Sequence, residues 1–170
     1  MKKILVVIDM QNDFVTGSLG SADAVAILPN VRERIKLARE NGVEVVFTRD
    51  THFENYFSTQ EGEKLPVLHC IKDTRGWEIV DGLFEEGERT FDKPTFGSAQ
   101  LAEFVKGEGF DEVELIGVCT DICVVSNALL IKAYCPEIKV QVRADCCAGV
   151  TKESHEAALK TMSSCQVEIL

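Results

Sequence analysis

Cys123 stands where a cysteine side chain could act as a nucleophile. It lies within the run LIGVCTDICVVSNALL (115–130). Residues 113–118, which overlap the start of this run, are mostly apolar and predict a buried strand. A helix is expected to start directly after this strand, and its unpaired N–H groups and dipole lower the cost of a thiolate in the first turn. Free cysteine is also among the most buried residue types, so a small core residue is the competing interpretation.

A thiol that attacks a carbonyl carbon needs a base for its proton, a positive charge near the thiolate, and N–H donors for the oxyanion. Asp9, which follows the apolar run 4–8, could be the base, and Lys93, which follows the strand-like pair 90–91, could supply the charge. Taken singly, the two residues also fit a turn-capping carboxylate and a solvated surface lysine. Their shared placement after strands, together with Cys123, favours chemistry.

A second polar group could bind a metal ion. Asp50 and His52 form an Asp-x-His pair after the strand expected over residues 43–48, and His69 follows in the next segment. Oxygen and nitrogen ligands suit zinc, iron or manganese. From the residues alone, a capping Asp50 and an exposed His52 remain the alternative.

The elements that must position these residues alternate between strands and helices. Strands are expected over residues 4–8, 43–48, 90–91, 113–118, 138–142 and 167–170. Helices are expected over about 28–40, 98–106, from 120 or 121 onward, and 151–163. This alternation predicts an α/β fold, a three-layer α/β/α doubly wound arrangement around a mainly parallel sheet of five or six strands. Ligands bind outside the carboxyl ends of such strands, so the polar residues named above should meet at one rim.

Several boundaries have local signals. Thr120 or Asp121 can cap the helix that carries Cys123, and Ala144-Asp145 marks the expected exit of the strand over 138–142. The apolar positions expected on the inner face of the Cys123 helix are Ile122, Val125, Leu129 and Ala133. Val31, Ile35 and Ala38 are expected on the inner face of the helix over 28–40, which stops at Asn41-Gly42. Ser98 is expected to cap the helix over 98–106, whose inner face holds Leu101, Ala102 and Val105. Thr151 with Ser154 is expected to start the last helix. His155 is interpreted as a surface residue. Residues 51–88 lack strong periodicity, and loops of that length inside a domain are usually functional.

Composition limits the classes of protein to consider. A chain of 170 residues with 45% hydrophobic residues fits one domain over residues 1–170. A formal charge of −10 argues against nucleic acid or an anionic membrane as a partner, and no segment is long and apolar enough for a transmembrane helix. The run Ile4 to Ile8 after Lys2-Lys3 is too short for a signal peptide and ends at Asp9.

Cysteine usage favours a cytoplasmic protein. The seven cysteines are an odd number spread through strand-like and helix-like segments, which suits a reducing compartment. The Cys119/Cys123 and Cys146-Cys147 spacings do not match a zinc knuckle. The remaining three, Cys70, Cys135 and Cys165, are expected to be packing residues.

Across its whole length the chain resembles the isochorismatase-like cysteine hydrolases, and among them the nicotinamidases. Five segments carry the resemblance in the family's order: IDMQNDF (8–14), TRDTH (48–52), LPVLHC (65–70), FDKPTFGS (91–98) and GVCTDICV (117–124). The resemblance implies a catalytic triad of Asp9, Lys93 and Cys123. It also implies a cis peptide bond between Val118 and Cys119 and an oxyanion hole made by the backbone amides of Cys119 and Cys123.

The resemblance also implies a bound metal that takes the pyridine nitrogen of the substrate. Its ligands would be Asp50, His52 and His69, with zinc favoured over iron or manganese and Glu61 preferred to Glu63 as the further ligand. In the family a tryptophan precedes the metal histidine, and here Leu65-Pro66 replaces it. Phe14 would pack on a planar substrate, and Phe96 is the second candidate contact.

The expected activity is hydrolysis of a small primary amide, in particular nicotinamide, to the acid and ammonia through a thioester. One alternative is an isochorismatase-like hydrolase of another amide or a vinyl ether. The other is a non-catalytic homologue that binds a ligand. Because relatives are often dimers or larger, a homo-oligomer is expected.

Overall fold

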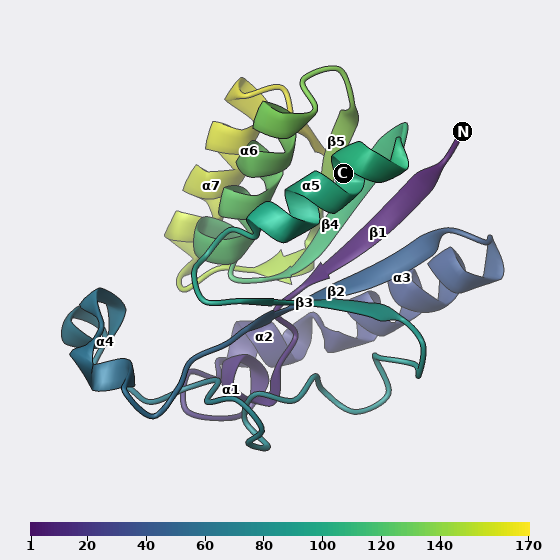
Figure 1. Ribbon diagram of the computed structural model, residues 1–170. Helices are drawn as coiled ribbons and strands as arrows, with labels where there is room; N and C mark the ends of the chain where they lie inside the picture. The colour runs from purple at the N-terminus through teal and green to yellow at the C-terminus, as the bar shows by residue number, and fades with distance from the viewer.

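A six-stranded sheet lies at the centre of the computed structural model, which describes residues 1–170 (Figure 1). All strand pairs are parallel and their order is β3-β2-β1-β4-β5-β6. The strands are β1 (Lys3–Ile8), β2 (Glu44–Asp50), β3 (Arg89–Lys93), β4 (Glu112–Val118), β5 (Lys139–Ala148) and β6 (Glu168–Ile169). The predicted doubly wound α/β/α fold is confirmed, because helices cover both faces of this sheet.

Helices form the two outer layers. They are α1 (Asn12–Val15), α2 (Ala22–Ala26), α3 (Leu28–Glu40), α4 (Gln60–Lys64), α5 (Ala99–Glu108), α6 (Val125–Tyr134) and α7 (Lys152–Ser164). Figure 1 shows α5, α6 and α7 together on one side of the sheet and α2 and α3 on the other. A 3₁₀ turn at Tyr56–Ser58 and a π-helical turn at Thr120–Val124 complete the set. No helix exceeds 13 residues, and none could cross a bilayer.

Alternation along the strands divides the buried side chains between two cores. In β1, Ile4, Val6 and Ile8 pack under α5, α6 and α7, whereas Leu5 and Val7 pack under α2 and α3. The sets predicted for the inner faces of two helices, Val31, Ile35 and Ala38 of α3 and Leu101, Ala102 and Val105 of α5, are all buried. Strands buried on both faces explain the continuous apolar runs in the sequence.

Three predicted helix boundaries are confirmed. Ser98 caps α5 by accepting a hydrogen bond from the N–H of Leu101 at 3.1 Å. Thr151 and Ser154 form a capping box at the start of α7, and α3 ends at Asn41 before Gly42, whose φ of +67° suits glycine.

The helix that carries Cys123 differs from the prediction. Cys119 is its N-cap, and neither Thr120 nor Asp121 caps it. The hydroxyl of Thr120 is bound to His155, and Asp121 accepts a hydrogen bond from the N–H of Val150. Thr120 therefore joins this turn to α7, and Asp121 joins it to the segment just before α7.

The buried face of α6 is also rotated from the predicted one. The buried residues are Cys123, Val124, Asn127, Ala128 and Ile131, whereas the predicted Ile122, Val125 and Leu129 are half-buried and Ala133 is exposed. A π turn holds more residues than an α turn, so the residues that follow it are rotated about the helix axis. His155, predicted to lie on the surface, is half-buried.

Other corrections concern the last two strands, the cysteines and the segment between β1 and α3. Strand β5 runs past the predicted exit at Ala144-Asp145 to Ala148, and β6 is shorter than predicted. Cys165 is exposed and Cys135 is half-buried, so only Cys70 of the three predicted packing cysteines is fully buried. The short helices α1 and α2 lie between β1 and α3, in a segment for which no helix was predicted.

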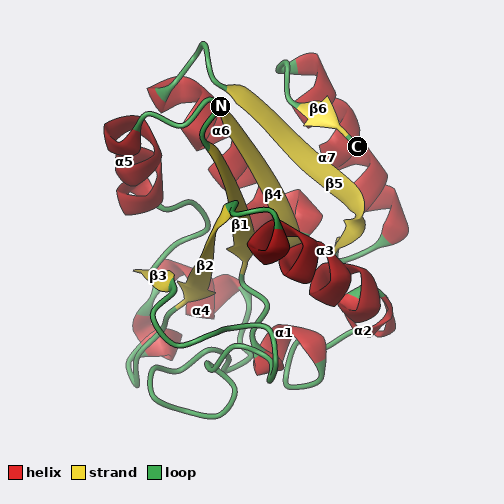
Figure 2. Ribbon diagram, turned by 90° about the vertical axis from the view of Figure 1, so that its right-hand side faces the viewer, coloured by secondary structure: helices red, strands yellow, loops and turns green.

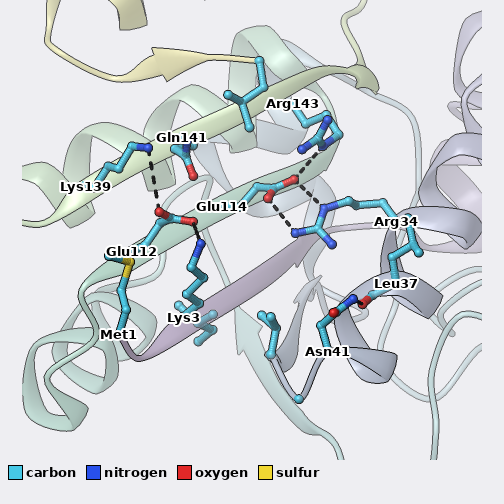
Figure 3. A pocket seen from close by; sticks show the side chains of 14 residues that line it. Met1, Lys3, Arg34, Leu37, Asn41, Glu112, Glu114, Lys139, Gln141 and Arg143 are labelled. Carbon is cyan, nitrogen blue, oxygen red and sulfur yellow. Dashed lines mark hydrogen bonds and ion pairs between the residues drawn. The ribbon is translucent and has the colours of Figure 1, made fainter.

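A cavity of about 630 Å³ opens at the amino end of the sheet (Figure 3). Both glutamates that line it are paired with basic side chains. Glu114 accepts hydrogen bonds from Arg34 and Arg143, both at 2.7 Å, and Glu112 pairs with Lys3 at 2.9 Å. None of the residues predicted to be functional lies at this end.

Candidate active site

The predicted functional residues gather at the opposite end, where the strands finish. Asp9 directly follows β1, Asp50 ends β2, Lys93 ends β3, and the π turn follows β4 by one residue. In a sheet ordered 3-2-1-4-5-6 the connections change direction between β1 and β4, and ligands bind at that switch point. Figure 2 shows the long loops collected at this end, around α1 and α4.

Lys93 connects the candidate catalytic side chains. It is 1% exposed, and its Nζ lies 2.6 Å from Oδ2 of Asp9 and 3.4 Å from Sγ of Cys123. The same ammonium group donates to the carbonyl of Thr95 at 3.2 Å and lies 3.4 Å from Oδ1 of Asp50. Burial opposes the charge of Lys93, yet the carboxylates and the thiol around it hold its pKa above the usual value.

Asp9 is fully buried and fixed from two sides. The hydroxyl of Thr48 donates to Oδ1 at 2.6 Å and accepts from the N–H of Asp9 at 3.1 Å, while Lys93 holds Oδ2. Burial raises the pKa of Asp9 and the charge of Lys93 opposes this increase. A carboxylate with a raised pKa is a better proton acceptor than an ordinary aspartate.

Cys123 lies within the π turn with its thiol directed at Lys93. Burial and the nearby Asp9 raise the pKa of the thiol, whereas Lys93 lowers it. The Cys123 thiol and the carboxyl group of Asp9 both contact the same buried ammonium group. The peptide bond between Val118 and Cys119 is cis, as the family resemblance implies, and the N–H of Cys119 makes no hydrogen bond within the chain.

Four side chains next to this triad form a group that could hold a metal ion. They are Asp50, His52, Glu61 and His69, and their ligand atoms all lie within 4.8 Å of one another. Nε2 of His52 is 2.9 Å from Oδ2 of Asp50, and Nε2 of His69 is 3.5 Å from the same oxygen. Oε1 of Glu61 is 3.6 Å from both ring nitrogens. The structure thus brings Glu61 to this group, while Glu63 is exposed.

This geometry fits a divalent metal. Ligand atoms arranged tetrahedrally around zinc lie about 3.3 Å apart, which is close to the observed separations. Nδ1 of His69 is 2.8 Å from the carbonyl of Val67, which leaves Nε2 facing the group. Burial opposes the charge of His69, but hydrogen bonds to Asp50 and Glu61 raise its pKa to about 10. The same two carboxylates would attract a cation.

Asp50 connects the metal-capable group to the triad. Asp50 presents Oδ2 to the histidines and Oδ1 to Lys93. Its backbone is fixed by Gln11, whose side chain accepts from the N–H of Asp50 at 2.7 Å and donates to its carbonyl at 2.9 Å. The two sets of side chains therefore form one continuous site.

The two predicted substrate contacts lie on different sides of this site. The ring of Phe14 is 5.6 Å from that of His69, centroid to centroid, and Phe14 is therefore beside the metal-capable group. Phe96 belongs to the loop between Lys93 and α5, and its ring is 42% exposed. Its backbone carbonyl accepts a hydrogen bond from Asn127, a residue of α6 one turn after Cys123.

Comparison with known proteins places this arrangement in a family. A sequence profile described as the isochorismatase domain matches residues 3–170. The chain belongs to the isochorismatase family. The matched part of this isochorismatase-family chain includes every residue of the triad and of the metal-capable group.

Members of the family with similar sequences include nicotinamidases. A nicotinamidase/pyrazinamidase of Mycobacterium tuberculosis is 27% identical over 99% of this chain and 98% of its own. A probable inactive nicotinamidase of Arabidopsis thaliana is 33% identical over 96% of this chain and 89% of its own. The crystal structure of a pyrazinamidase of Pyrococcus horikoshii in complex with zinc has a TM-score of 0.88 and 31% identity, covering 100% of this chain and 99% of that one.

Three side chains in the site of this isochorismatase-family protein were not predicted from its sequence. Thr48 binds Asp9, Asn127 binds the carbonyl of Cys123, and the buried ring of Tyr56 packs edge-on against both His52 and His69. Thr48 is inside the quoted TRDTH segment, which is a usable signal. Asn127 and Tyr56 belong to none of the five segments, so the sequence offers no comparable signal for them.

Proposed function

We propose that this protein is a cysteine amidohydrolase that converts nicotinamide to nicotinate and ammonia. Its family and its relatives make it an amide-acting hydrolase. The observation that carries the finer proposal is the buried contact of Lys93 with both Asp9 and Cys123, directly beside a group of two carboxylates and two imidazoles. One of the relatives is described as inactive, so the argument for catalysis depends on these residues of this chain.

The first half of the proposed reaction forms a thioester. Asp9 accepts the proton of Cys123, and the thiolate attacks the amide carbonyl carbon. The N–H groups of Cys119 and Cys123 stabilise the negative charge that develops on the carbonyl oxygen. The carbon–nitrogen bond then breaks, and the departing nitrogen takes the proton from Asp9 and leaves as ammonia.

The second half releases the acid. Asp9 accepts a proton from water, whose oxygen attacks the thioester carbonyl. The carbon–sulfur bond breaks, and the thiolate of Cys123 recovers the proton from Asp9. Throughout, Lys93 holds the carboxylate and the sulfur within reach of one another by its 2.6 and 3.4 Å contacts.

Asp50, His52, Glu61 and His69 would hold a divalent metal, and zinc suits this mixed oxygen and nitrogen set. When bound, the ion supplies a Lewis-acidic position for the ring nitrogen of the substrate. Phe14, beside His69, offers its ring to the face of a planar substrate.

The proposal predicts that the protein distinguishes nicotinamide from benzamide. The two amides have the same shape, but only nicotinamide has a ring nitrogen to place at the metal-capable group. Ammonia release should therefore show a kcat/KM about 10⁴-fold higher for nicotinamide, the discrimination expected when a site built for a polar contact loses it. Equal rates on both amides would refute pyridine recognition and favour a hydrolase of other small amides.

A further inference from the structure

Asn127 is a fully buried amide side chain whose hydrogen bonds all lead to the candidate active site. It is 0% exposed and lies in α6, four residues after Cys123. Its Nδ2 donates to the carbonyl of Cys123 at 2.8 Å and to the carbonyl of Phe96 at 3.1 Å. Its Oδ1 accepts from the N–H of Ser98 at 2.9 Å. Both amide hydrogens and the oxygen of this side chain are therefore in use.

These bonds join two segments that are distant in the sequence. One is the π turn that carries Cys123. The other is the loop of residues 94–98, which directly follows Lys93 and supplies the Thr95 carbonyl that accepts a hydrogen bond from the Lys93 ammonium group. The thiol belongs to the π turn, and the ammonium group belongs to Lys93, the residue directly before the loop, so their 3.4 Å contact depends on how the turn and the loop are placed.

The Asn127 side chain is hydrogen-bonded to two residues of the loop 94–98. Phe96 is bound through its carbonyl and Ser98 through its N–H, as a neighbouring strand would bind them. Because Ser98 is also the N-cap of α5, its hydrogen bond to Asn127 fixes the loop at the start of that helix. A small shift of a catalytic group away from its productive position can cost about 100-fold in rate.

We propose that Asn127 is a positioning residue that sets the distance between the Cys123 thiol and Lys93 by fastening the loop 94–98 to the nucleophile turn. This inference rests on the proposed roles of Cys123 and Lys93. Asn127 itself acts only through the backbone atoms that it binds. Two of its three partners, Phe96 and Ser98, lie outside the helix that carries Asn127.

Two variants test the hydrogen bonds of Asn127 to the loop 94–98 separately from its bond to the Cys123 carbonyl. Asn127→Ala removes all three bonds. In Asn127→Ser the hydroxyl can still donate to the carbonyl four residues earlier, as serine does in helices, but it no longer reaches the loop. If the hydrogen bonds of Asn127 to the loop 94–98 position the thiol, both variants lose about 10- to 100-fold in kcat for amide hydrolysis. The alkylation of Cys123 by iodoacetamide then also slows by about tenfold or more. Wild-type rates in Asn127→Ser would overturn the inference, because the loop would then need no fastening.

Peptide-resolved mass spectrometry distinguishes positioning from a general loss of structure. Residues 107–132 form one tryptic peptide, in which fragment ions separate Cys123 from Cys119. Exposed Cys165 serves as the reactive standard and buried Cys147 as the protected one. If Asn127 is a positioning residue, Cys123 is alkylated more slowly in both variants while Cys147 stays protected from alkylation. A Cys147 that becomes reactive in both variants would overturn it and leave Asn127 a purely structural role.

Gln141 provides a matched control. It is a buried amide that lines the cavity at the amino end of the sheet (Figure 3) and donates a hydrogen bond to Glu168 at 2.8 Å. Gln141→Ala should leave the alkylation of Cys123 and kcat unchanged. A loss as large as that in Asn127→Ala would overturn the inference. Alkylation of Cys123 needs no substrate, so a wild-type protein inactive on nicotinamide would refute the proposed function and leave this test in place.

Discussion

Replacing Cys123 by alanine should abolish amide hydrolysis while leaving the fold intact. The thiol lies 3.4 Å from the Lys93 ammonium group, and without it no thioester can form. Loss of a nucleophile that acts together with a base and a positioning group costs about 10⁴-fold or more in kcat. Ammonia release measures the loss, and circular dichroism with thermal unfolding measures the fold.

Cys147→Ala is the control for this substitution. Cys147 is another buried cysteine, on β5, and its contacts are with the apolar core. Its replacement removes the same atoms from the interior but should leave the rate of ammonia release within about twofold. Wild-type activity in Cys123→Ala would mean that the nucleophile is wrongly assigned.

Asp9→Asn should reduce kcat by about 10²- to 10⁴-fold, the range typical of a lost general base. Asparagine has the shape of aspartate and can still bind Thr48, but it cannot accept the proton of Cys123. Substrate binding should change much less, because Asp9 is enclosed by Thr48 and Lys93. Steady-state kinetics with nicotinamide separate kcat from KM.

The neighbouring carboxylate Asp92 is the control here. It lies on β3 next to Lys93 but pairs with Arg49 at 2.7 Å instead of with the triad. Asp92→Asn should keep wild-type kcat. An Asp9→Asn variant that hydrolyses nicotinamide as fast as Asp92→Asn would exclude Asp9 as the base.

Much of the site's location followed from strand periodicity alone. The apolar runs before Asp9, Asp50 and Cys119 had to be strands, and parallel strands have their carboxyl ends at one edge of the sheet. The edge that gathers Asp9, Lys93 and Cys123 was therefore predictable before any distance was known. The roles of these residues came from the family resemblance, because each one alone also fitted an ordinary structural position.

The details of the nucleophile turn were not predictable in the same way. Thr120 and Asp121 are good helix caps, yet they bind His155 and Val150, about 30 residues further along the chain. A π turn leaves no periodic signal, so the buried face of α6 was predicted out of phase. Tertiary contacts override local capping preference in such a segment.

The choice between Glu61 and Glu63 also depended on the fold. Both residues lie in the short helix α4, two positions apart, so they point in different directions. Thr59 caps this helix, and Tyr56 packs between it and the two histidines. These contacts turn Glu61 toward His52 and His69 and leave Glu63 in solvent.

Ammonia release from nicotinamide by the purified wild-type protein, measured before and after treatment with a strong chelator, tests the central claim most directly. We expect one ammonia and one nicotinate for each nicotinamide consumed. We also expect this activity to be lost after chelation and to return when zinc is added. No ammonia from nicotinamide, in a sample that elemental analysis shows to contain its metal, would contradict the proposed activity.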